Sequence, residues 1–564
     1  MQDTLRAIPF LSSLTDQELT LLTQHVRRKH YHKGASVFLA GEPDDCMYLI
    51  ESGLVKIVSQ DEQQEKFILY LGPGNFFGEG AALFGGSHSA SVYVVIDATL
   101  LLLYHDDLME LLPQHPAMAL TIIRELHQRL RVSLRAPIQS KELTLITTLG
   151  DATPMLAQQL AHVAGEDVLL FDLGGQGETS LDAVLLNEDH VTLVHADAAL
   201  NGETLPERLS RLIKRYYWIV LWIPPTEHPL TLKAINQADL RVIVGTALVH
   251  QGQRLASGQW IEISDDPIAI HRLARRLARR QVGLALSSGN ARGIAHIGVI
   301  KALHENNIPV DMIAGTSAGA LFGAMYAAGQ SLAEMTRFAL GVPREYNFIT
   351  GFRNWDFIFP PRLGLIKGDM LLNRVRELVG DKTFEELPIP LAVVAADLVS
   401  GEEIVFERGP LAEALRASMS MGGFLEPAQH DGRLLIDGGA VNPVPTQPLA
   451  ARGMNLVIAS NVIPTLNERL RWRRSQHEWR VANLLDSILN EREIMEGEII
   501  RARMRPVDVL IQPEVAHYHV RQYDKARELI QAGEDATQTQ IAYIRQLLAP
   551  RPRKATSAPQ TPVA

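Results

Sequence analysis

A serine stands between two glycines in the stretch DMIAGTSAGALFG, residues 311–323. Ser317 follows an apolar run typical of a buried strand, and the small residues after it are typical of a helix. A hydroxyl on such a sharp strand-to-helix turn is exposed, while Gly315 and Gly319 leave room for the neighbouring strand and helix. The helix behind it offers N–H donors and the positive end of a dipole. The pattern predicts a nucleophilic serine.

A nucleophilic serine needs a base and donors for the oxyanion, and two other segments offer them. Upstream, LALSSGNARGIAHIGVIKAL (284–303) reads as a strand, a loop of small residues and a helix that starts near Gly293. Such a loop can direct backbone N–H groups at a developing negative charge. Downstream, LLIDGGAVNPVP (434–445) carries Asp437 from a strand into a turn formed by Gly438 and Gly439. A plain turn-forming role for Asp437 would fit the same residues.

In this order the three segments, with ALRASMSMGGFLEPA (414–428), resemble the patatin-like phospholipases over roughly residues 283–463. The resemblance implies that Ser317 is the nucleophile and Asp437 the base of a two-residue dyad. It implies an oxyanion loop at Ser288, Gly289, Asn290, Arg292 and Gly293. The implied reaction is hydrolysis of the acyl ester of a lysophospholipid or phospholipid, a lysophospholipase or phospholipase A activity that requires no metal or other cofactor.

The oxyanion loop departs from the usual Gly-Gly-Gly-x-Arg-Gly of that family, because Ser288 and Asn290 replace two glycines. The donors are backbone amides, which Ser and Asn also possess, and Asn tolerates left-handed backbone better than most residues. A misplaced donor would cost about 100- to 1000-fold in rate. Two alternatives therefore stay open: a catalytically weak or dead lipid- or nucleotide-sensing module, and a general carboxylesterase.

Two histidines could convert the dyad into a Ser-His-Asp triad. His296 lies near the start of the helix after the oxyanion loop, where a packing or capping role is the simpler interpretation, and His430 lies in a predicted hairpin turn. In the dyad interpretation Asp437 accepts the serine proton directly, which requires a close contact and a partly desolvated carboxylate.

Residues 8–135 contain short alternating apolar segments separated by Gly, Pro and Asp, which predicts a β-roll flanked by helices. Thr15 and Glu18 form a capping box that predicts a helix over 15–30. KGASVFLAGEPDDCMYLIESGLVKIV (33–58) and LGPGNFFGEGAALFGGSHSASVYVV (71–95) resemble a cyclic-nucleotide-binding domain of the catabolite-activator type. The resemblance implies a nucleotide pocket at Gly78, Glu79, His88 and Ser89, with Glu79 on the ribose hydroxyl.

The nucleotide pocket departs from that family at its phosphate group. The family places an arginine there, whereas this sequence has His88. A neutral imidazole offers one donor and no fixed charge, while arginine gives a bidentate cationic contact. We therefore expect a retained scaffold, and we do not count a cyclic nucleotide as an established regulator.

Residues 141–265 alternate strand-like and helical stretches, which predicts a parallel sheet covered by helices. The segments 143–173 and 216–245 resemble a partition-type ATPase of Rossmann-like architecture. Its phosphate loop should carry a lysine, but residues 148–153 read TLGDAT, and an Asp there would repel a triphosphate. We expect a structural unit without nucleotide.

The elements thus predict a multidomain α/β chain. The expected parts are a β-roll (8–135), a degenerate P-loop-like α/β domain (141–265), a linker helix (266–281), a patatin-like α/β hydrolase domain (282–463), a helical C-terminal extension (464–550) with one strand near 507–513, and a disordered tail (551–564). The three resemblances in series are those of bacterial relatives of neuropathy target esterase.

The composition of the chain limits the kinds of partner that we expect it to bind. A formal net charge of −10 and the absence of a basic helix-turn-helix after the roll argue against nucleic acid. The single cysteine, the lack of a signal peptide and the lack of a membrane-spanning run fit a cytoplasmic protein. The segment LNERLRWRRSQHEWR (466–480) combines arginines with two tryptophans, so peripheral contact with the inner face of a membrane is an expectation beside that of an ordinary solvated helix. The oligomeric state is not predicted.

Overall fold

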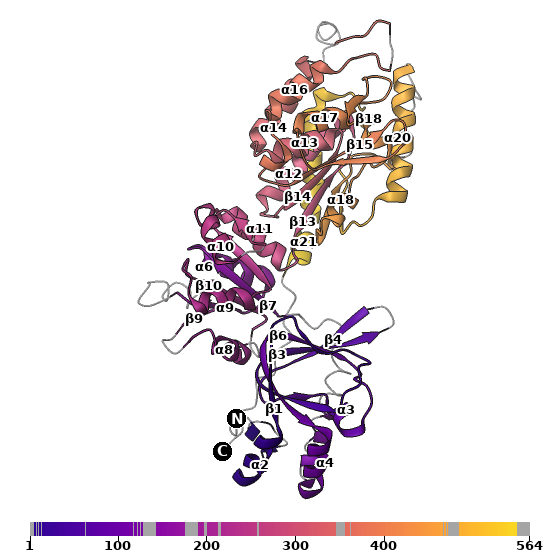
Figure 1. Cartoon of the computed structure of the whole chain (residues 1–564). Helices are drawn as coiled ribbons and strands as arrows, with labels where there is room; N and C mark the ends of the chain where they lie inside the picture. Colours follow the sequence, from indigo (N-terminus) through magenta and orange to yellow (C-terminus); the bar gives the residue numbers. More distant parts are fainter. Residues whose placement is uncertain are drawn as a thin grey trace. The chain divides into compact units, whose positions relative to one another are not determined.

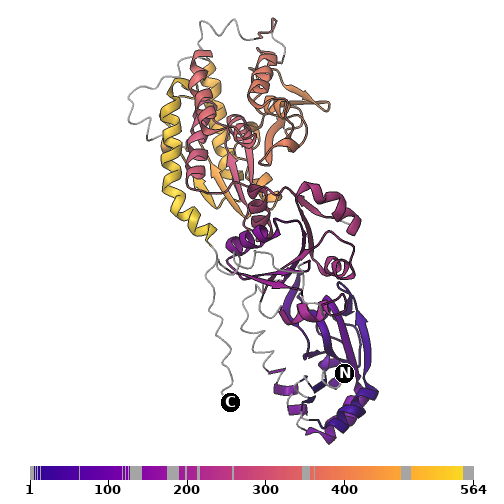
Figure 2. The same ribbon diagram turned by 90° about the vertical axis from the view of Figure 1, so that its left-hand side faces the viewer.

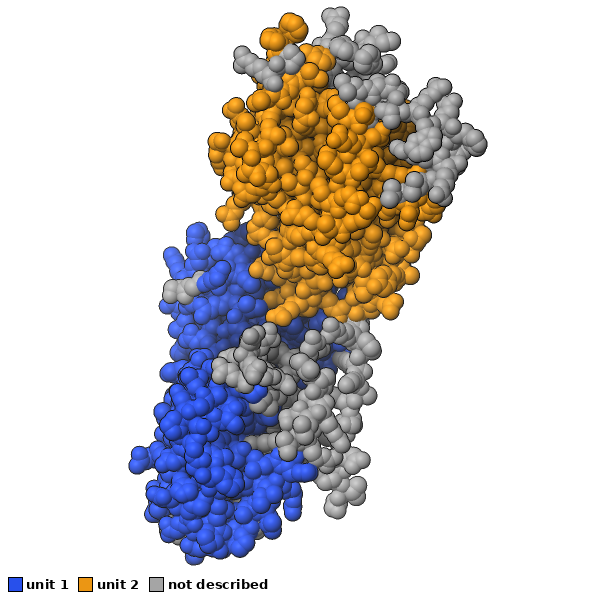
Figure 3. Space-filling model, turned by 90° about the vertical axis from the view of Figure 1, so that its right-hand side faces the viewer, with its two compact units in different colours: residues 1–274 blue, residues 275–564 orange. Residues whose placement is uncertain are grey.

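A computed structural model of the 564-residue chain divides into two compact units, residues 1–274 and 275–564, which Figure 3 shows in separate colours. It describes residues 5–549 with the following exceptions: 7, 9–10, 13, 62–63, 117, 121, 125, 128–142, 175–189, 197–199, 213–215, 257–258, 346–355, 361–362, 466, 470 and 472–483. The predicted tail at 551–564 and most of the arginine- and tryptophan-rich segment at 466–480 therefore lie outside the described residues.

The first part of unit 1 is an antiparallel β-roll, as predicted (Figure 1). The chain pairs β6 with β1, β2 and β3, and β3 also pairs with β4 and β5. The elements are α2 (Asp16–His25), β1 (Arg27–Tyr31), β2 (Ser36–Phe38), β3 (Cys46–Asp61), β4 (Gln64–Leu71), β5 (Phe76–Phe77), α3 (Glu79–Phe84), β6 (Ser91–Tyr104) and α4 (His105–Gln114).

The predicted helix over 15–30 is wrong in its second half. Thr15 and Glu18 do form a capping box at the start of α2, but the helix ends at His25. Residues 27–31 form β1 instead, which pairs with residues 98–102 of β6. The basic RRKHY run offers no apolar helical face, and the long partner strand supplies its backbone hydrogen bonds.

The second part of unit 1 is a six-stranded parallel sheet with the order β12-β11-β7-β10-β8-β9, which confirms the predicted α/β alternation. Its elements are β7 (Thr144–Leu149), α6 (Thr153–Ala164), β8 (Val168–Asp172), β9 (Val191–His195), α8 (Leu205–Leu212), β10 (Trp218–Ile223), α9 (Pro229–Gln237), β11 (Leu240–Val244), α10 (Val249–Leu255) and β12 (Ile261–Ile263).

Polar and apolar contacts join the roll to this sheet within unit 1. Asp97 of β6 is buried, accepts a hydrogen bond from the Lys33 N–H at 2.7 Å and pairs with the Lys233 ammonium of α9. Leu54, Val95 and Ile96 share a hydrophobic cluster with side chains of the parallel sheet. The carboxylate is therefore satisfied by both parts of the unit, as a buried charge requires.

Unit 2 is built on an eight-stranded mixed sheet with the order β17-β18-β15-β14-β13-β19-β20, in which β16 also pairs with β15. Its elements, after α11 (Pro267–Leu277), are β13 (Val282–Leu286), α12 (Ala295–Glu305), β14 (Met312–Thr316), α13 (Ala318–Ala327), α14 (Leu332–Glu345), α16 (Asp369–Val379), β15 (Leu391–Asp397), β16 (Glu403–Phe406), α17 (Leu411–Ser418), β17 (Ala428–His430), β18 (Arg433–Asp437), α18 (Gln447–Ala451), β19 (Leu456–Ser460), α20 (Leu484–Arg503), β20 (Val509–Ile511) and α21 (Ala526–Leu548).

The C-terminal extension is part of the core of unit 2. β20 lies within the predicted 507–513 strand and pairs in parallel with β19. The long helix α21, yellow in Figure 2, packs along α12, where Gly298 and Gly533 let the two backbones approach closely. Lys301 pairs with Glu534 across this contact at 2.8 Å. Residues beyond 463 thus complete the sheet and cover one of its helices.

Candidate active site

Ser317 occupies the sharp turn between β14 and α13 that the sequence predicted. Its backbone has φ 54° and ψ −118°, a region that residues other than glycine rarely adopt, at a cost of about 1–3 kcal/mol. A Cβ at Gly319 would lie 2.2 Å from the Leu286 carbonyl oxygen, and one at Gly315 would lie 2.6 Å from the backbone of Ala320. Both flanking glycines are therefore required by close backbone approach.

Hydrogen bonds from β15 and α17 hold the turn in place. The Ser317 N–H donates to the Ser418 hydroxyl at 2.9 Å, and that hydroxyl donates to the Val394 carbonyl at 2.6 Å. Thr316 donates to the Asn442 carbonyl at 2.8 Å, in the segment that follows Asp437. These contacts fix the strained serine from several sides, which is how a strained backbone persists.

Asp437 ends β18, which is separated from β14 by β15 alone. The pairing register sets Thr316 opposite Val394 and Asp437 opposite Ala395, so the aspartate and the serine turn stand at neighbouring levels of the sheet. The Asp437 N–H donates to the Ser420 carbonyl at 2.9 Å, two residues beyond the hydroxyl that holds Ser317. Strands distant in sequence thus bring the two predicted residues to one region.

The Asp437 carboxylate is buried and is held through one oxygen. Oδ1 accepts a hydrogen bond from the Gly439 N–H at 2.8 Å and lies 2.7 Å from Nη2 of Arg492 on α20. In the described part of the chain, Oδ2 accepts no hydrogen bond, and no hydrogen bond joins Asp437 to Ser317. The arrangement leaves one carboxylate oxygen to take a proton.

The predicted oxyanion loop follows β13 and enters a short 3₁₀ turn over Asn290–Ile294. The Ser288 N–H donates to the Pro443 carbonyl, whereas the N–H groups of Gly289 and Asn290 donate no hydrogen bond among the residues that the structure describes. Asn290 has φ 49°, a left-handed conformation that asparagine tolerates. A Cβ at Gly293 would lie 2.5 Å from the Ala318 Cβ, so the loop packs against the residue after Ser317.

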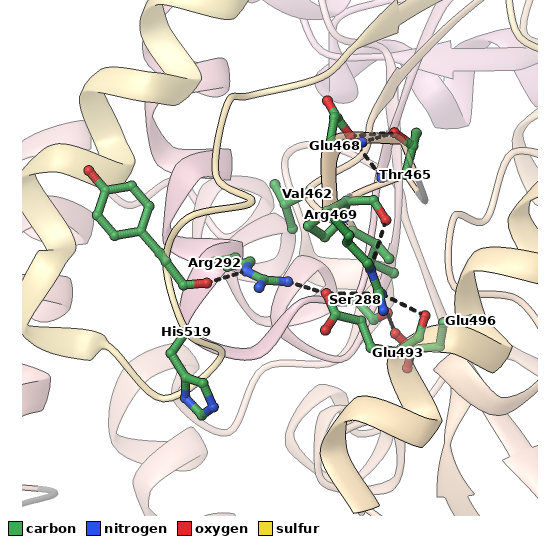
Figure 4. A network of polar contacts seen from close by, with 12 residues as sticks. Ser288, Arg292, Val462, Thr465, Glu468, Arg469, Glu493, Glu496 and His519 are labelled. Carbon is green, nitrogen blue, oxygen red and sulfur yellow. Dashed lines mark hydrogen bonds and ion pairs between the residues drawn. The ribbon is translucent and has the colours of Figure 1, made fainter. Parts of the chain in front are cut away.

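Helix α20 contacts both the oxyanion loop and the base. Arg292 donates to the Tyr518 carbonyl at 2.8 Å and pairs with Glu493, and the Ser288 hydroxyl donates to Glu496 at 3.2 Å (Figure 4). Arg492 Nε donates to Glu496 at 2.8 Å. Sequence reasoning missed Arg492, Glu493 and Glu496, because a charged run in a helix is ordinarily a solvated face.

The two histidines considered for a triad have other partners. His296 is fully buried, with Nδ1 2.9 Å from the Ser460 hydroxyl and Nε2 2.9 Å from the Ser287 carbonyl, and burial lowers its pKa to about 4. His430 lies at the β17–β18 hairpin beside Asp431 and the Phe406 ring. Among the described residues, neither ring bonds to Ser317 or Asp437, and the buried contacts of His296 fit the packing role expected for it.

The residues predicted to line a nucleotide pocket, Gly78, Glu79, His88 and Ser89, lie at the start of α3 and just before β6. Gly78 and Glu79 stand at the start of α3, and Ser89 is exposed beside His88. His88 is buried, stacks on Phe38 at 3.4 Å between ring centroids, and places Nε2 3.0 Å from an Asp44 oxygen. A carboxylate thus stands where a cyclic phosphate would meet the predicted arginine position.

The degenerate phosphate loop is a tight turn. Gly150 has φ 130°, and a Cβ there would lie 2.0 Å from the Val244 carbonyl oxygen. The Thr153 hydroxyl donates to the Gly150 carbonyl at 2.8 Å and so closes the turn on itself. The loop offers no cationic side chain of its own to a triphosphate.

Two family models match the chain. The model described as patatin-like phospholipase covers residues 284–450, and the cyclic nucleotide-binding domain model covers residues 28–115. The helix α20, with Arg492, lies outside both matches. In the described part of the chain, no helix combines the length and the apolar character needed to cross a membrane.

Curated relatives extend the similarity over both parts. An uncharacterized NTE family protein of Mycobacterium tuberculosis is 26% identical, over 79% of this chain and 78% of that protein. A second one from the same species is 42% identical, over 32% of this chain and 48% of that protein. Mouse patatin-like phospholipase domain-containing protein 7 is 25% identical, over 76% of this chain and 38% of that protein.

Proposed function

We propose that this chain, which carries a cyclic nucleotide-binding domain and a patatin-like phospholipase domain, hydrolyses the acyl ester of lysophospholipids or phospholipids through Ser317 and Asp437. The family match indicates a lipid esterase in general. The observation that carries the finer proposal is the strained turn at Ser317, which stands one strand away from a buried carboxylate with an uncommitted oxygen.

In the first half-reaction, Ser317 Oγ attacks the acyl carbonyl while Oδ2 of Asp437 takes the hydroxyl proton. Negative charge then develops on the carbonyl oxygen. The unpaired N–H groups of Gly289 and Asn290 are the donors that stabilise it. Collapse of the tetrahedral intermediate breaks the ester bond, and the proton on Asp437 passes to the departing alcohol.

In the second half-reaction, Asp437 accepts a proton from water as the water attacks the acyl-enzyme. The same two N–H groups stabilise the second tetrahedral intermediate. Its collapse releases the fatty acid and returns the proton to Ser317. These steps need only the side chains and amides of this chain, and no cofactor enters the proposal.

Exposed apolar side chains near the site support contact with a lipid surface. Phe359 is 96% exposed and Val399 is 81% exposed. Val399 follows β15, at the edge of the sheet where β14 delivers Ser317. Arg416 of α17 donates to the carbonyls of Lys367 and Gly368, and the preceding residue Ile366 forms a β-bridge with Phe357, two residues before Phe359. We propose that these side chains insert peripherally into a membrane surface. Apolar side chains that are exposed to water gain free energy when they move into the lipid.

We further propose that the roll modulates this activity through protein contacts rather than through a bound cyclic nucleotide. The His88–Asp44 pair supports the second part, because a carboxylate repels a cyclic phosphate. The buried pairing of Asp97 with Lys233 shows that the roll already makes protein contacts, here with the parallel sheet of unit 1.

The test measures fatty-acid release from lysophosphatidylcholine and hydrolysis of 4-nitrophenyl esters of short and long acyl chains. We expect wild type to hydrolyse the long-chain substrates faster. Ser317→Ala should reduce turnover to the background rate, because the nucleophile is lost. Asp437→Asn should reduce kcat by at least about 100-fold, the lower range of general-base catalysis.

Each alternative has its own outcome in this test. Turnover of short-chain esters alone would favour a general carboxylesterase. Absence of turnover with every ester would favour the sensing module. Turnover that persists in Ser317→Ala would place the reaction elsewhere in the chain and overturn the proposed mechanism.

A further inference from the structure

One turn of α20 reaches three parts of the candidate site. Arg492 pairs with the Asp437 carboxylate. Glu493 pairs with Arg292 of the oxyanion loop. Glu496 accepts a hydrogen bond from the Ser288 hydroxyl. The turn formed by Gly439 is in direct contact with this helix, because a Cβ there would lie 2.5 Å from Glu496 Oε1. The contacts come from residues outside the family match at 284–450.

The contact between Arg492 and Asp437 discriminates between the two carboxylate oxygens. Arg492 Nη2 and the Gly439 N–H both address Oδ1, at 2.7 and 2.8 Å. A hydrogen bond from Gly439 and an ion pair with Arg492 thus meet at one oxygen and hold the carboxylate through it. The other oxygen, Oδ2, accepts no hydrogen bond within the described residues.

The charges around Asp437 show what Arg492 supplies besides position. Among the described residues, the charged groups in contact with the carboxylate or with its partner are Arg492 and Glu496, both on α20. Arg292 of the oxyanion loop pairs with Glu493 instead. Burial, with the charge of Asp437, raises the pKa of Glu496, and Arg492 opposes that rise. Burial works to lower the pKa of Arg492, but the two carboxylates outweigh it, so the guanidinium stays charged.

Removal of Arg492 would leave two buried carboxylates facing each other. Like charges in one buried site cannot both ionise freely, so the pair would retain a proton at higher pH. A protonated Asp437 cannot accept the Ser317 proton. The guanidinium therefore places a positive charge between the two carboxylates.

We propose that Arg492 is a positioning residue of the active site, which fixes Asp437 through Oδ1 and sets a positive charge beside the carboxylate so that Oδ2 receives the Ser317 proton. The inference rests on the proposed esterase function. It makes the C-terminal extension a working part of the site rather than an appendage to the catalytic domain.

The experiment measures kcat/KM for 4-nitrophenyl butyrate against pH in the full-length protein. The variants are Arg492→Gln, Arg492→Lys, Glu496→Gln and the charge-balanced double variant Arg492→Gln/Glu496→Gln. Arg501→Gln is the matched control, because Arg501 lies on the same helix and pairs with exposed Glu498 instead of the site.

The acidic limb of the profile reports protonation of the base in the free enzyme. In Arg492→Gln we expect the limb to move up by about one to three pH units, the effect of losing an adjacent opposite charge. Each unit costs about tenfold in kcat/KM at pH values below the limb. Arg492→Lys should keep the limb near its wild-type position, since it keeps the charge. Glu496→Gln and Arg501→Gln should not raise it.

If Arg492→Gln does not fold, the double variant is compared with Glu496→Gln, from which it differs only at Arg492, and the limb should again move up. The inference is overturned if the acidic limb stays in place when Arg492→Gln is compared with wild type, or when the double variant is compared with Glu496→Gln. A fall in kcat/KM without a shift of the limb is what a purely structural role of Arg492 predicts. Failure of the proposed function looks different: wild type would then show no hydrolysis that Ser317→Ala abolishes, and the inference would fall with it.

Discussion

The oxyanion loop of unit 2 and the phosphate position of the roll both depart from the residues that their families usually carry, but with different consequences. In the predicted oxyanion loop, Asn290 replaces a glycine, yet neither its N–H nor that of Gly289 donates a hydrogen bond to any residue that the structure describes. In the roll, His88 replaces an arginine and is bound to Asp44. The first site uses backbone groups that every residue except proline possesses, whereas the second depends on one side chain.

The comparison shows which substitutions a site survives. A backbone donor is retained when the new residue adopts the same φ and ψ, as Asn290 does at φ 49°. A guanidinium has no substitute in imidazole, because neither its charge nor its two-pronged geometry is kept. When a motif residue is substituted, the consequence therefore depends on whether the functional atoms belonged to the main chain or to the side chain.

The largest effect in this comparison is expected at Gly289. A Cβ there would lie 2.4 Å from the Val462 Cγ2, so Gly289→Ala must shift the loop and its N–H. We expect a fall in kcat of about 100-fold, the lower range for loss of one oxyanion donor. Esterase assays on a protein with unchanged circular dichroism would measure it.

The matched control is Asn290→Gly, which restores the family's usual residue. Because glycine adopts the same left-handed backbone, its kcat should stay within about threefold of wild type. A large change in Asn290→Gly with no change in Gly289→Ala would show that the Asn290 side chain, rather than the backbone, carries the function of this loop.

The second effect concerns stability at acid pH, which we expect to differ between the two units. His296 of unit 2 has a pKa of about 4 because it is buried, whereas an unfolded histidine titrates near 6.5. The unfolded state thus binds a proton that the folded state does not. Stability of unit 2 is full above about pH 6.5 and falls by roughly 3 kcal/mol as pH drops to about 4.

Asp97 of unit 1 gives the contrasting case. Burial works to raise its pKa, but the Lys233 contact and other hydrogen bonds outweigh it and lower the pKa to about 2. The stability that ionised Asp97 contributes to unit 1 is present above about pH 3.8 and is lost only below that value.

The test is calorimetry of the full chain from pH 7 to 4.5. The unfolding temperature should fall with pH, and it should fall less in His296→Gln. An equal pH slope in that variant would contradict the assignment to His296.

The smallest effect is expected in the roll. Isothermal titration with cyclic AMP or cyclic GMP should show no saturable binding at micromolar concentrations, because the Asp44 carboxylate repels the phosphate and His88 offers no fixed positive charge. The double variant His88→Arg/Asp44→Asn should bind at least about tenfold more tightly, the effect of regaining a charge-assisted contact. If wild type bound a cyclic nucleotide at micromolar concentrations, the phosphate position of the roll would have kept its function despite His88. The contrast with the oxyanion loop would then be wrong.

Much of the site could be predicted from local sequence. The turn at Ser317, the loop at 288–293 and the Asp437 turn are each specified by glycines and by neighbouring strands in short segments. Residues 27–31 were expected as helix, because the capping box marks where α2 starts but not where it ends. The strand there forms by pairing with β6, about 70 residues away, which no local pattern reports.

Arg492, Glu493 and Glu496 could not have been assigned in advance. Their run reads as a solvated helix face, since charged residues in a helix are ordinarily exposed. Only the packing of α20 against the Gly439 turn buries Glu493 and Glu496. The same packing pairs the three side chains with Asp437, Arg292 and Ser288.

The sequence alone predicted the β-roll, the parallel-sheet part and the patatin-like part, together with the candidate nucleophile, base and backbone donors. These predictions were possible because strand–turn–helix patterns are local and the glycine positions can be read from the chain. The tertiary structure alone decided how charges are paired around those groups. Pairing energies depend on distance and burial between distant segments, so the guanidinium beside Asp437 and the carboxylate beside His88 became visible only once the chain was folded.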